Sequence, residues 1–255
     1  MPAPKNTFKQ RLNAGETLIG CWLGLADDYA AEVMGTAGFD WLVVDGEHGP
    51  NDIRSIRAQL TALAACTSEP VVRLPIGETW MIKQALDAGA QTLLIPMVDS
   101  AEQTAQLVAA CRYPPHGVRG VGAALGRASR FNEITDYVPT ANAEICLLVQ
   151  VESVKGLAAL DDILAIEGVD GVFIGPADLS TDMGFGGNSE APEVKATIKD
   201  ALGKIAAAGK APGILATTDA PTQRYLDQGA KFIAVGADVL MLADAARSLA
   251  KRWKP

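Results

Sequence analysis

The sequence lacks the features that mark membrane-spanning or secreted proteins. In its 255 residues the apolar runs are short, such as Trp41–Val44 and Leu93–Val98, and none approaches the roughly 20 residues of a membrane helix. Met1 to Leu12 mixes charge with proline and contains no apolar segment of a secretory signal. We therefore expect a cytoplasmic protein with no membrane partner.

Basic clusters and paired cysteines are also scarce. The chain has 30 acidic and 22 basic residues, for a net charge of −8, and no basic run is longer than Lys251-Arg252. Because binding to a phosphate backbone needs clustered lysine and arginine, we expect no nucleic-acid partner. The four cysteines lie far apart without a C-x-x-C pair, which predicts buried free thiols in a reducing compartment.

Eight short apolar segments are spaced along the chain, and each is followed by a segment with helical periodicity. Such segments are typical of parallel strands buried on both faces. Eight β units, each followed by a helix, predict one domain over residues 1–255, an α/β protein with a (β/α)8 TIM barrel. An open doubly wound sheet is the alternative, but no Gly-rich fingerprint opens the first helix. We expect strands at 18–25, 41–45, 70–74, 92–98, 145–151, 171–175, 213–217 and 232–236, and helices at 28–37, 51–67, 81–88, 101–111, 156–164, 193–208, 222–228 and 237–253.

Two connections are longer than a barrel needs. Residues 112–144 include Arg127 and Arg130, and residues 179–192 are rich in glycine, serine and asparagine. Loops of this length are usually functional or part of an interface. We expect both to leave the carboxyl ends of strands, where barrels place their active sites.

The second strand ends in Val44-Asp45-Gly46-Glu47-His48, which contains one of only two histidines. An aspartate three residues before a histidine can accept the imidazole N–H, fix the tautomer and raise the basicity of the ring. We therefore predict a catalytic pair of Asp45 and His48. The alternative is a turn whose polar residues cap the next helix, and Glu47 is interpreted as a solvated neighbour.

Arg73 lies in the third apolar segment, where a guanidinium is costly to bury without an anion. It is expected to clamp a carboxylate or a developing oxyanion, and the alternative is a structural ion pair with another barrel acid.

Glu152 and Asp178 end strands one βα unit apart, so they are expected side by side at the mouth of the barrel. Two close carboxylates repel unless they share a proton or a cation. Without a nearby histidine or cysteine ligand, the pair suits Mg²⁺ or Mn²⁺. In the alternative, one carboxylate pairs with Arg73 and no metal binds.

No expected strand carries a lysine in its interior, because Lys210 and Lys231 lie at strand starts and Lys155 lies beyond the fifth strand. A Schiff-base aldolase needs a buried lysine there. If the protein stabilises a carbanion, we expect it to use a metal.

Several of these motifs occur together in one known family. The chain resembles the HpcH/HpaI aldolases, in order and over nearly its whole length, and above all the pyruvate-dependent class II branch that is 4-hydroxy-2-oxoheptanedioate aldolase-like. The motifs that carry the resemblance are Val44-Asp45-Gly46-Glu47-His48, Val72-Arg73-Leu74-Pro75, Tyr113-Pro114-Pro115, Gln150-Val151-Glu152-Ser153 and Gly175-Pro176-Ala177-Asp178.

The resemblance implies a lyase that reversibly cleaves 4-hydroxy-2-oxo acids to pyruvate and an aldehyde, in aromatic or sugar-acid catabolism. It implies a divalent metal, Mg²⁺ or Mn²⁺ with Co²⁺ or Zn²⁺ as alternatives. The implied roles are metal ligands for Glu152 and Asp178, base for His48, partner of the base for Asp45, enolate stabilisation for Arg73, and a substrate pocket lined by Arg73, Gln150, Trp22, Ala177 and Asp178.

The resemblance further implies a homo-oligomer, either a hexamer or a trimer of dimers, with C-terminal helices exchanged between neighbours. Asp87 matches an acid that a neighbour lends to the substrate site. Gly49, where the family pattern has alanine, and residues 183–191 depart from that pattern, which leaves the aldehyde partner open.

Two other functions remain as alternatives. A CoA-thioester lyase of the malyl- or citramalyl-CoA type would want basic residues around the mouth, for which Arg119–Arg130 is the candidate segment. A non-catalytic barrel that binds a small carboxylate would show binding without turnover.

Overall fold

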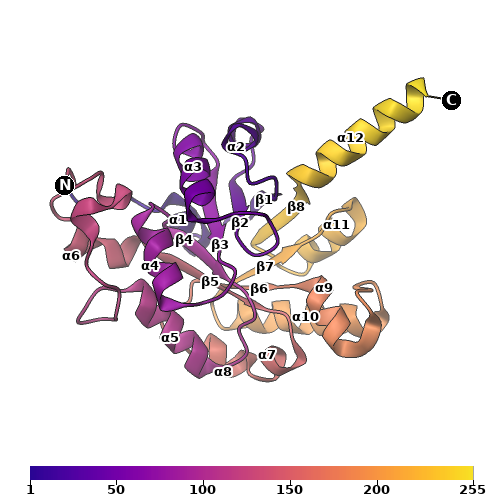
Figure 1. Ribbon diagram of the computed structural model, residues 1–255. Helices are drawn as coiled ribbons and strands as arrows, with labels where there is room; N and C mark the ends of the chain where they lie inside the picture. The colour runs from indigo at the N-terminus through magenta and orange to yellow at the C-terminus, as the bar shows by residue number, and fades with distance from the viewer. Residues whose placement is uncertain (255) are drawn as a thin grey trace.

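The computed structural model describes residues 1–254 and contains a closed barrel of eight parallel strands, which confirms the predicted fold (Figure 1). The strands pair in chain order, and β8 closes on β1. The strands are β1 (Leu18–Leu23), β2 (Trp41–Asp45), β3 (Glu69–Arg73), β4 (Thr92–Ile95), β5 (Cys146–Val151), β6 (Gly171–Ile174), β7 (Ala211–Leu215) and β8 (Phe232–Ala237).

Helices follow the strands as expected, except that the helix expected at 156–164 is divided in two at Ala159, where the backbone leaves the helical region. The larger helices are α2 (Asp28–Gly35), α3 (Ile53–Leu63), α4 (Thr79–Asp87), α5 (Ala101–Cys111), α7 (Val154–Ala158), α8 (Leu160–Leu164), α10 (Pro192–Ala207), α11 (Asp219–Asp227) and α12 (Asp238–Trp253). Short elements that the sequence pattern did not reveal are α1 (Thr7–Asn13), α6 (Tyr137–Ala141), α9 (Pro176–Ser180), η1 (Ala123–Leu125), η2 (Arg127–Ser129), η3 (Asn142–Glu144) and η4 (Thr181–Phe185).

Aromatic rings fill the interior of the barrel. Phe8, Trp41 and Phe232 are buried and meet edge to face, with ring centroids 5.9–6.2 Å apart. Glycines on the strands make room for these rings, because a Cβ at Gly20 would collide with the ring of Trp41. Edge-to-face packing of this kind gives a rigid floor beneath the mouth of the barrel.

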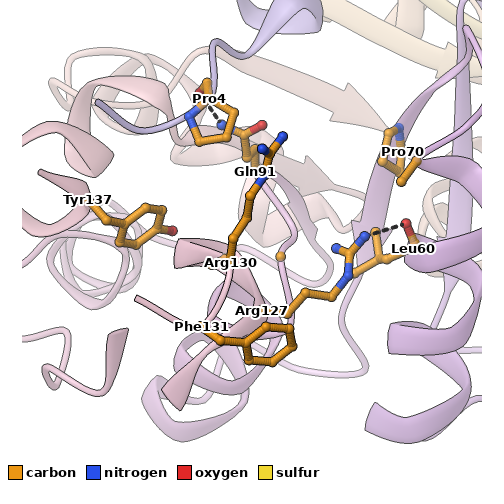
Figure 2. A pocket seen from close by; sticks show the side chains of 11 residues that line it. Pro4, Leu60, Pro70, Gln91, Arg127, Arg130, Phe131 and Tyr137 are labelled. Atoms are coloured by element: carbon orange, nitrogen blue, oxygen red, sulfur yellow. Dashed lines mark hydrogen bonds between the residues drawn. The ribbon is translucent and has the colours of Figure 1, made fainter. Parts of the chain in front are cut away.

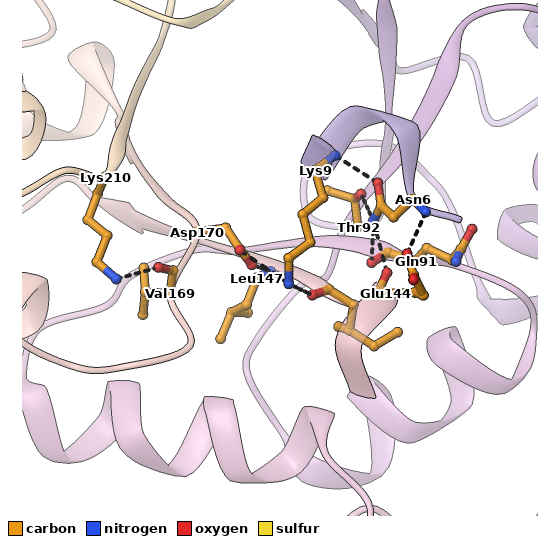
Figure 3. A network of polar contacts seen from close by, with 10 residues as sticks. Asn6, Lys9, Gln91, Thr92, Glu144, Leu147, Val169, Asp170 and Lys210 are labelled. Atoms are coloured by element: carbon orange, nitrogen blue, oxygen red, sulfur yellow. Dashed lines mark hydrogen bonds and ion pairs between the residues drawn. The ribbon is translucent and has the colours of Figure 1, made fainter. Parts of the chain in front are cut away.

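The N-terminal helix α1 closes the opposite end of the barrel through a polar network (Figure 3). Asn6 caps α1 and donates to the side chain of Thr92 on β4, while its backbone N–H donates to Glu144. Lys9 binds the carbonyl of Ile145 at 2.7 Å and lies 3.3 Å from the Asp170 carboxylate. These contacts tie the chain start to the amino ends of the strands.

The long segment 112–144 lies at this same end, so its expected position at the carboxyl ends of strands is wrong. It follows the carboxyl end of α5 and leads into the amino end of β5. Pro2 pairs with Asp136, and Ala3 donates to Thr140, which places the segment beside the N-terminus. A helix of a βα unit runs antiparallel to its strand, so an insertion after the helix belongs to the end away from the active site.

The last helix leaves the barrel and projects away from it (Figure 1). Within α12 only Asp238 is buried, and its carboxylate accepts the backbone N–H of Gly24 at 2.7 Å. Apolar side chains along the helix stay exposed, among them Leu242 and Trp253.

None of the helices in the described part of the chain is both long and apolar enough to cross a membrane. All four cysteines are free thiols, as expected, although Cys66 is only half-buried.

Candidate active site

Asp45 and Arg73 form a buried ion pair at the carboxyl ends of β2 and β3. These two residues are register partners in the parallel ladder, so the strands themselves place them side by side. Both oxygens of Asp45 are used, with Nε of Arg73 at 2.9 Å and Nη2 at 2.7 Å. The side chains are only 4% and 8% exposed. A bidentate pair with this burial fixes the plane of the guanidinium.

This pairing corrects the expected contact between Asp45 and the ring of His48. No hydrogen bond joins that ring to Asp45 within residues 1–254; Asp45 instead accepts the backbone N–H groups of Glu47 at 3.0 Å and His48 at 3.3 Å. A guanidinium on the neighbouring strand offers two strong donors, and it takes both carboxylate oxygens. Asp45 therefore holds the turn that carries His48, whose side chain is exposed.

Glu47 belongs to the same cluster, which the sequence reading missed. Its carboxylate lies 2.8 Å from Nη1 of Arg73, and its side chain is 17% exposed. Burial raises the pKa of Glu47, and the charges of Arg73 and His48 only partly offset this effect. The two-residue spacing from Asp45 across Gly46 is the signal that could have placed both acids on one arginine.

Burial alone would raise the pKa of Asp45, but its hydrogen bonds and charge interaction with Arg73 outweigh that effect and lower it. The Arg73 guanidinium also lies 5.2 Å from the ring of Trp22 on β1, at the top of the aromatic floor. Arg73 is thus held by two carboxylates at its edges and one ring at its face.

Glu152 follows β5 and is almost fully buried, with 2% of its surface exposed. Its carboxylate accepts the backbone N–H of Met97 at 3.0 Å and the side-chain amide of Gln150. Burial raises the pKa of Glu152, and the nearby charges of Asp178 and Glu47 add to that effect. A Cβ at Gly175 would collide with the Glu152 carboxylate, so glycine is needed before Pro176.

Asp178 lies in the first turn of α9, after Pro176 at the start of the helix, and its side chain is exposed. Ala177 precedes it on the same exposed turn. Burial is the main cause of the raised pKa of both Glu47 and Glu152, and the charge of Asp178 adds to it in each case. The structure thus brings His48, Glu47, Arg73, Glu152 and Asp178 to one end of the barrel.

No group of three or more histidine, cysteine, aspartate or glutamate side chains in residues 1–254 is placed to hold a metal ion by itself. The expected ligand set has only two carboxylates, which leaves room for other oxygens. Close to Glu152, the buried Oε1 of Gln150 has no hydrogen-bond partner among the described residues.

Asp87 is the one expected site residue that lies elsewhere. It ends α4, at the amino end of β4, and accepts from Nη2 of Arg119 at 2.8 Å. Asp87 therefore lies at the end of the barrel opposite the mouth of the same chain.

Gly49 is explained by the turn it occupies. A Cβ there would lie 2.5 Å from the carbonyl oxygen of Asp45, so this backbone excludes the alanine of the family pattern.

The chain is similar to known proteins over nearly its whole length. The HpcH/HpaI aldolase/citrate lyase family profile matches residues 18–245. A hydroxypyruvate/pyruvate aldolase of Roseovarius nubinhibens is 62% identical over 100% of this chain and 99% of its own length. A 4-hydroxy-2-oxo-heptane-1,7-dioate aldolase of Salmonella dublin is 55% identical over 98% of this chain and 95% of its length. The crystal structure of an HpcH/HpaI aldolase/citrate lyase family protein from Burkholderia cenocepacia J2315 is 42% identical, with a TM-score of 0.94 over 98% of this chain and 100% of that chain.

Asp45→Asn should destabilise the protein by about 3 kcal/mol or more near neutral pH, because it leaves the buried Arg73 charge without its bidentate partner. Since the folded protein lowers the pKa of Asp45, its ionisation stabilises the fold above the usual aspartate pKa, and that contribution is lost as the pH falls through the lowered value. Urea unfolding at stepwise lower pH should therefore show the two stability curves converging. Asp162→Asn on the exposed face of α8 is the control, and a stability difference that does not change with pH would contradict the assignment.

Proposed function

The chain belongs to the HpcH/HpaI aldolase/citrate lyase family, and from that premise we propose that it reversibly cleaves 4-hydroxy-2-oxo acids into pyruvate and an aldehyde. The observation that carries the proposal is the cluster at the barrel mouth, where a buried arginine lies between two carboxylates and beside the acids of β5 and α9. The aldolase names of relatives that match the whole chain support a carbon–carbon lyase.

Cleavage needs a base for the proton of the C4 hydroxyl, and we assign that role to His48. As the proton moves to the imidazole, the electrons of the O–H bond form the aldehyde carbonyl. The C3–C4 bond breaks, and its electron pair forms the C2–C3 double bond of an enolate. Protonation at C3 then gives pyruvate, and the reverse sequence adds pyruvate to an aldehyde. Asp45 contributes by fixing the turn that carries the base.

Arg73 is the donor for the enolate oxygen. A guanidinium has five N–H groups. Asp45 accepts one from Nε and one from Nη2, and Glu47 forms an ion pair at Nη1, so at least one N–H remains on each Nη atom. These remaining groups are held in place before the substrate arrives, so no reorganisation is needed as charge develops. A preorganised donor of this kind contributes roughly 3–4 kcal/mol to lowering the barrier.

Glu152 and Asp178 fit a divalent cation. Burial raises the pKa of the Glu152 carboxylate, and the charges of Asp178 and Glu47 raise it further. A cation bound between these acids would offset both effects. We assign these two carboxylates as the ligands of Mg²⁺ or Mn²⁺, with Co²⁺ or Zn²⁺ as alternatives, and Gln150 Oε1 as a neighbouring neutral oxygen. When bound, such an ion supplies Lewis-acid stabilisation of negative charge on the 2-oxo oxygen.

A divalent ion should raise the unfolding temperature of chelator-treated protein, because it binds the folded state alone. At 100 times its dissociation constant, the ion contributes about 2.7 kcal/mol. Glu152→Gln should lose this stabilisation, whereas Glu167→Gln, an exposed carboxylate at the other end of the barrel, should keep it. The measurement is thermal unfolding with and without Mn²⁺. Equal stabilisation of both variants, or full activity after stringent chelation, would rule out the metal role.

Arg73→Lys should lower kcat/KM for pyruvate release by about 100-fold or more, since a lysine cannot reproduce the forked contact to two acids and the enolate. Pyruvate is measured by a coupled assay on a 4-hydroxy-2-oxo acid. Arg54→Lys, an exposed residue of α3, is the matched control. If the folded Arg73→Lys protein retains wild-type kcat/KM, the enolate is stabilised elsewhere.

The names of the relatives also favour a second donor substrate. The Roseovarius protein is called a hydroxypyruvate/pyruvate aldolase. We propose that hydroxypyruvate can replace pyruvate here, and a panel of aldehydes with each donor compares the two.

The CoA-thioester alternative has less support, because Arg119–Arg130 lies at the end of the barrel away from the mouth. Assaying free acids against CoA esters separates the two classes.

We propose a homo-oligomer in which α12 packs on a second copy of the chain, as in the hexamer or trimer of dimers that the resemblance implies. The projecting helix exposes Leu242 (59%), Leu249 (56%) and Trp253 (77%), which a second copy would cover. Asp87 lies away from its own barrel mouth, so any contact it makes with substrate would be in a neighbour's site.

Leu242→Glu combined with Leu249→Glu should therefore reduce the oligomer to smaller species, because the charges would be buried in the interface. Sedimentation velocity at one protein concentration measures the size. Arg247→Glu, on the same exposed helix, is the charge control. An unchanged sedimentation coefficient in the double variant would show that α12 does not form the interface.

A further inference from the structure

A cavity lined by both apolar and polar residues lies at the end of the barrel opposite the catalytic mouth. It encloses about 440 Å³, within the range of small-molecule sites. Its walls come from the start of β3, the connection into β4, the end of α3 and the segment after η1 (Figure 2). Its charged lining residues are Arg127 and Arg130, and no acidic residue lines it.

The Arg127 side chain is held in this cavity by two hydrogen bonds to backbone carbonyls. Its Nη1 donates to the carbonyl of Ala88 at 3.3 Å and its Nη2 to the carbonyl of Leu60 at 3.2 Å, at the carboxyl ends of α4 and α3. Gly89 has a φ of +108°, a backbone conformation that favours glycine, and a Cβ there would meet Nη1 of Arg127 and displace it. These two carbonyl contacts fix the guanidinium while leaving its other N–H groups available.

Arg130 reaches along the cavity toward Gln91 and Pro4 (Figure 2). It follows η2 in the left-handed conformation, and Phe131 and Asn132 share that conformation, with φ values of 51°, 56° and 72°. The turn is closed by hydrogen bonds, including Asn132 N–H to the Ser129 hydroxyl at 2.9 Å. The Arg130 side chain has no hydrogen-bond or ion-pair partner in the described chain.

The positive charges here are not balanced by protein carboxylates. Neither Arg127 nor Arg130 forms an ion pair within residues 1–254, and neither does the nearby Arg57. Burial and the charge of Arg57 both lower the pKa of Arg127. In a chain with a net charge of −8, two unpaired arginines in one cavity and the charge of Arg57 near them are a local excess that an anion would neutralise.

We propose that this cavity binds a small dianion, a phosphoryl group or a pair of carboxylates, between Arg127 and Arg130. The free edges of the two guanidinium groups match paired anionic oxygens. The exposed ring of Phe131 and the buried ring of Tyr137 both line the cavity and offer apolar surface to the organic part of such a ligand. Because the cavity is at the amino ends of the strands, the anion is distinct from a substrate at the mouth of the same barrel.

The test is calorimetric titration of the full-length protein with inorganic phosphate and, separately, with succinate, at constant ionic strength. We expect saturable binding of one of them that Arg130→Gln weakens about tenfold or more, as loss of a charge-assisted contact does. Arg57→Gln, which removes the flanking charge, should weaken it less. Arg54→Gln, an exposed arginine on the same helix as Arg57, should bind like the wild type.

The two ligand arms distinguish a phosphoryl from a dicarboxylate ligand. Aldolase activity without added anion should be unchanged in Arg130→Gln, which shows that the barrel mouth is intact. No saturable binding, or binding that Arg130→Gln and Arg54→Gln leave equally unaffected, would overturn the proposal. A change in the sedimentation coefficient of Arg130→Gln would also overturn it, by showing that a second copy of the chain occupies the cavity.

Discussion

The buried contact between Asp45 and Arg73 determines the geometry of the catalytic mouth. A guanidinium keeps its charge in the interior, so the fold must surround it with acceptors. Asp45 and Glu47 supply them from one turn, and the same Asp45 carboxylate holds the backbone of that turn through two N–H groups. One interaction therefore places the proposed base and aims the proposed enolate donor. Moving either residue would displace both functions.

The aromatic residues support this arrangement from below. Only 5% of the chain is aromatic, yet rings fill the barrel interior, from Phe8 at the closed end to Trp22 beneath Arg73. A rigid floor prevents the guanidinium from sinking into the barrel, while the paired carboxylates prevent it from turning toward solvent. The position of Arg73 thus depends on apolar packing as much as on charge.

The sequence was sufficient to predict the barrel, because parallel strands that are buried on both faces, such as 41–45, appear in the sequence as continuous apolar runs. It was also sufficient to gather Asp45, Arg73, Glu152 and Asp178, since residues at the carboxyl ends of neighbouring strands must meet. The sequence did not reveal which acidic side chain pairs with which basic side chain. Asp45 was assigned to His48 by proximity along the chain, whereas the register of β2 with β3 brings it to Arg73. Segment 112–144 was misplaced for a similar reason, because its start was counted from a strand and not from the helix that reverses the chain.

The two ends of the barrel carry opposite excesses of charge, and this follows from how the strands are used. At the mouth, Asp45, Glu47, Glu152 and Asp178 face one buried arginine, so the cluster is acidic unless a cation joins it. At the closed end, Arg57, Arg127 and Arg130 have no acidic partner in the described chain. The strands and their packed interior separate the two clusters, so neither can neutralise the other. The cation proposed for the mouth and the anion proposed for the closed end would each supply the missing counter-charge from outside the fold. The net charge of −8 for the whole chain therefore conceals two clusters of opposite sign.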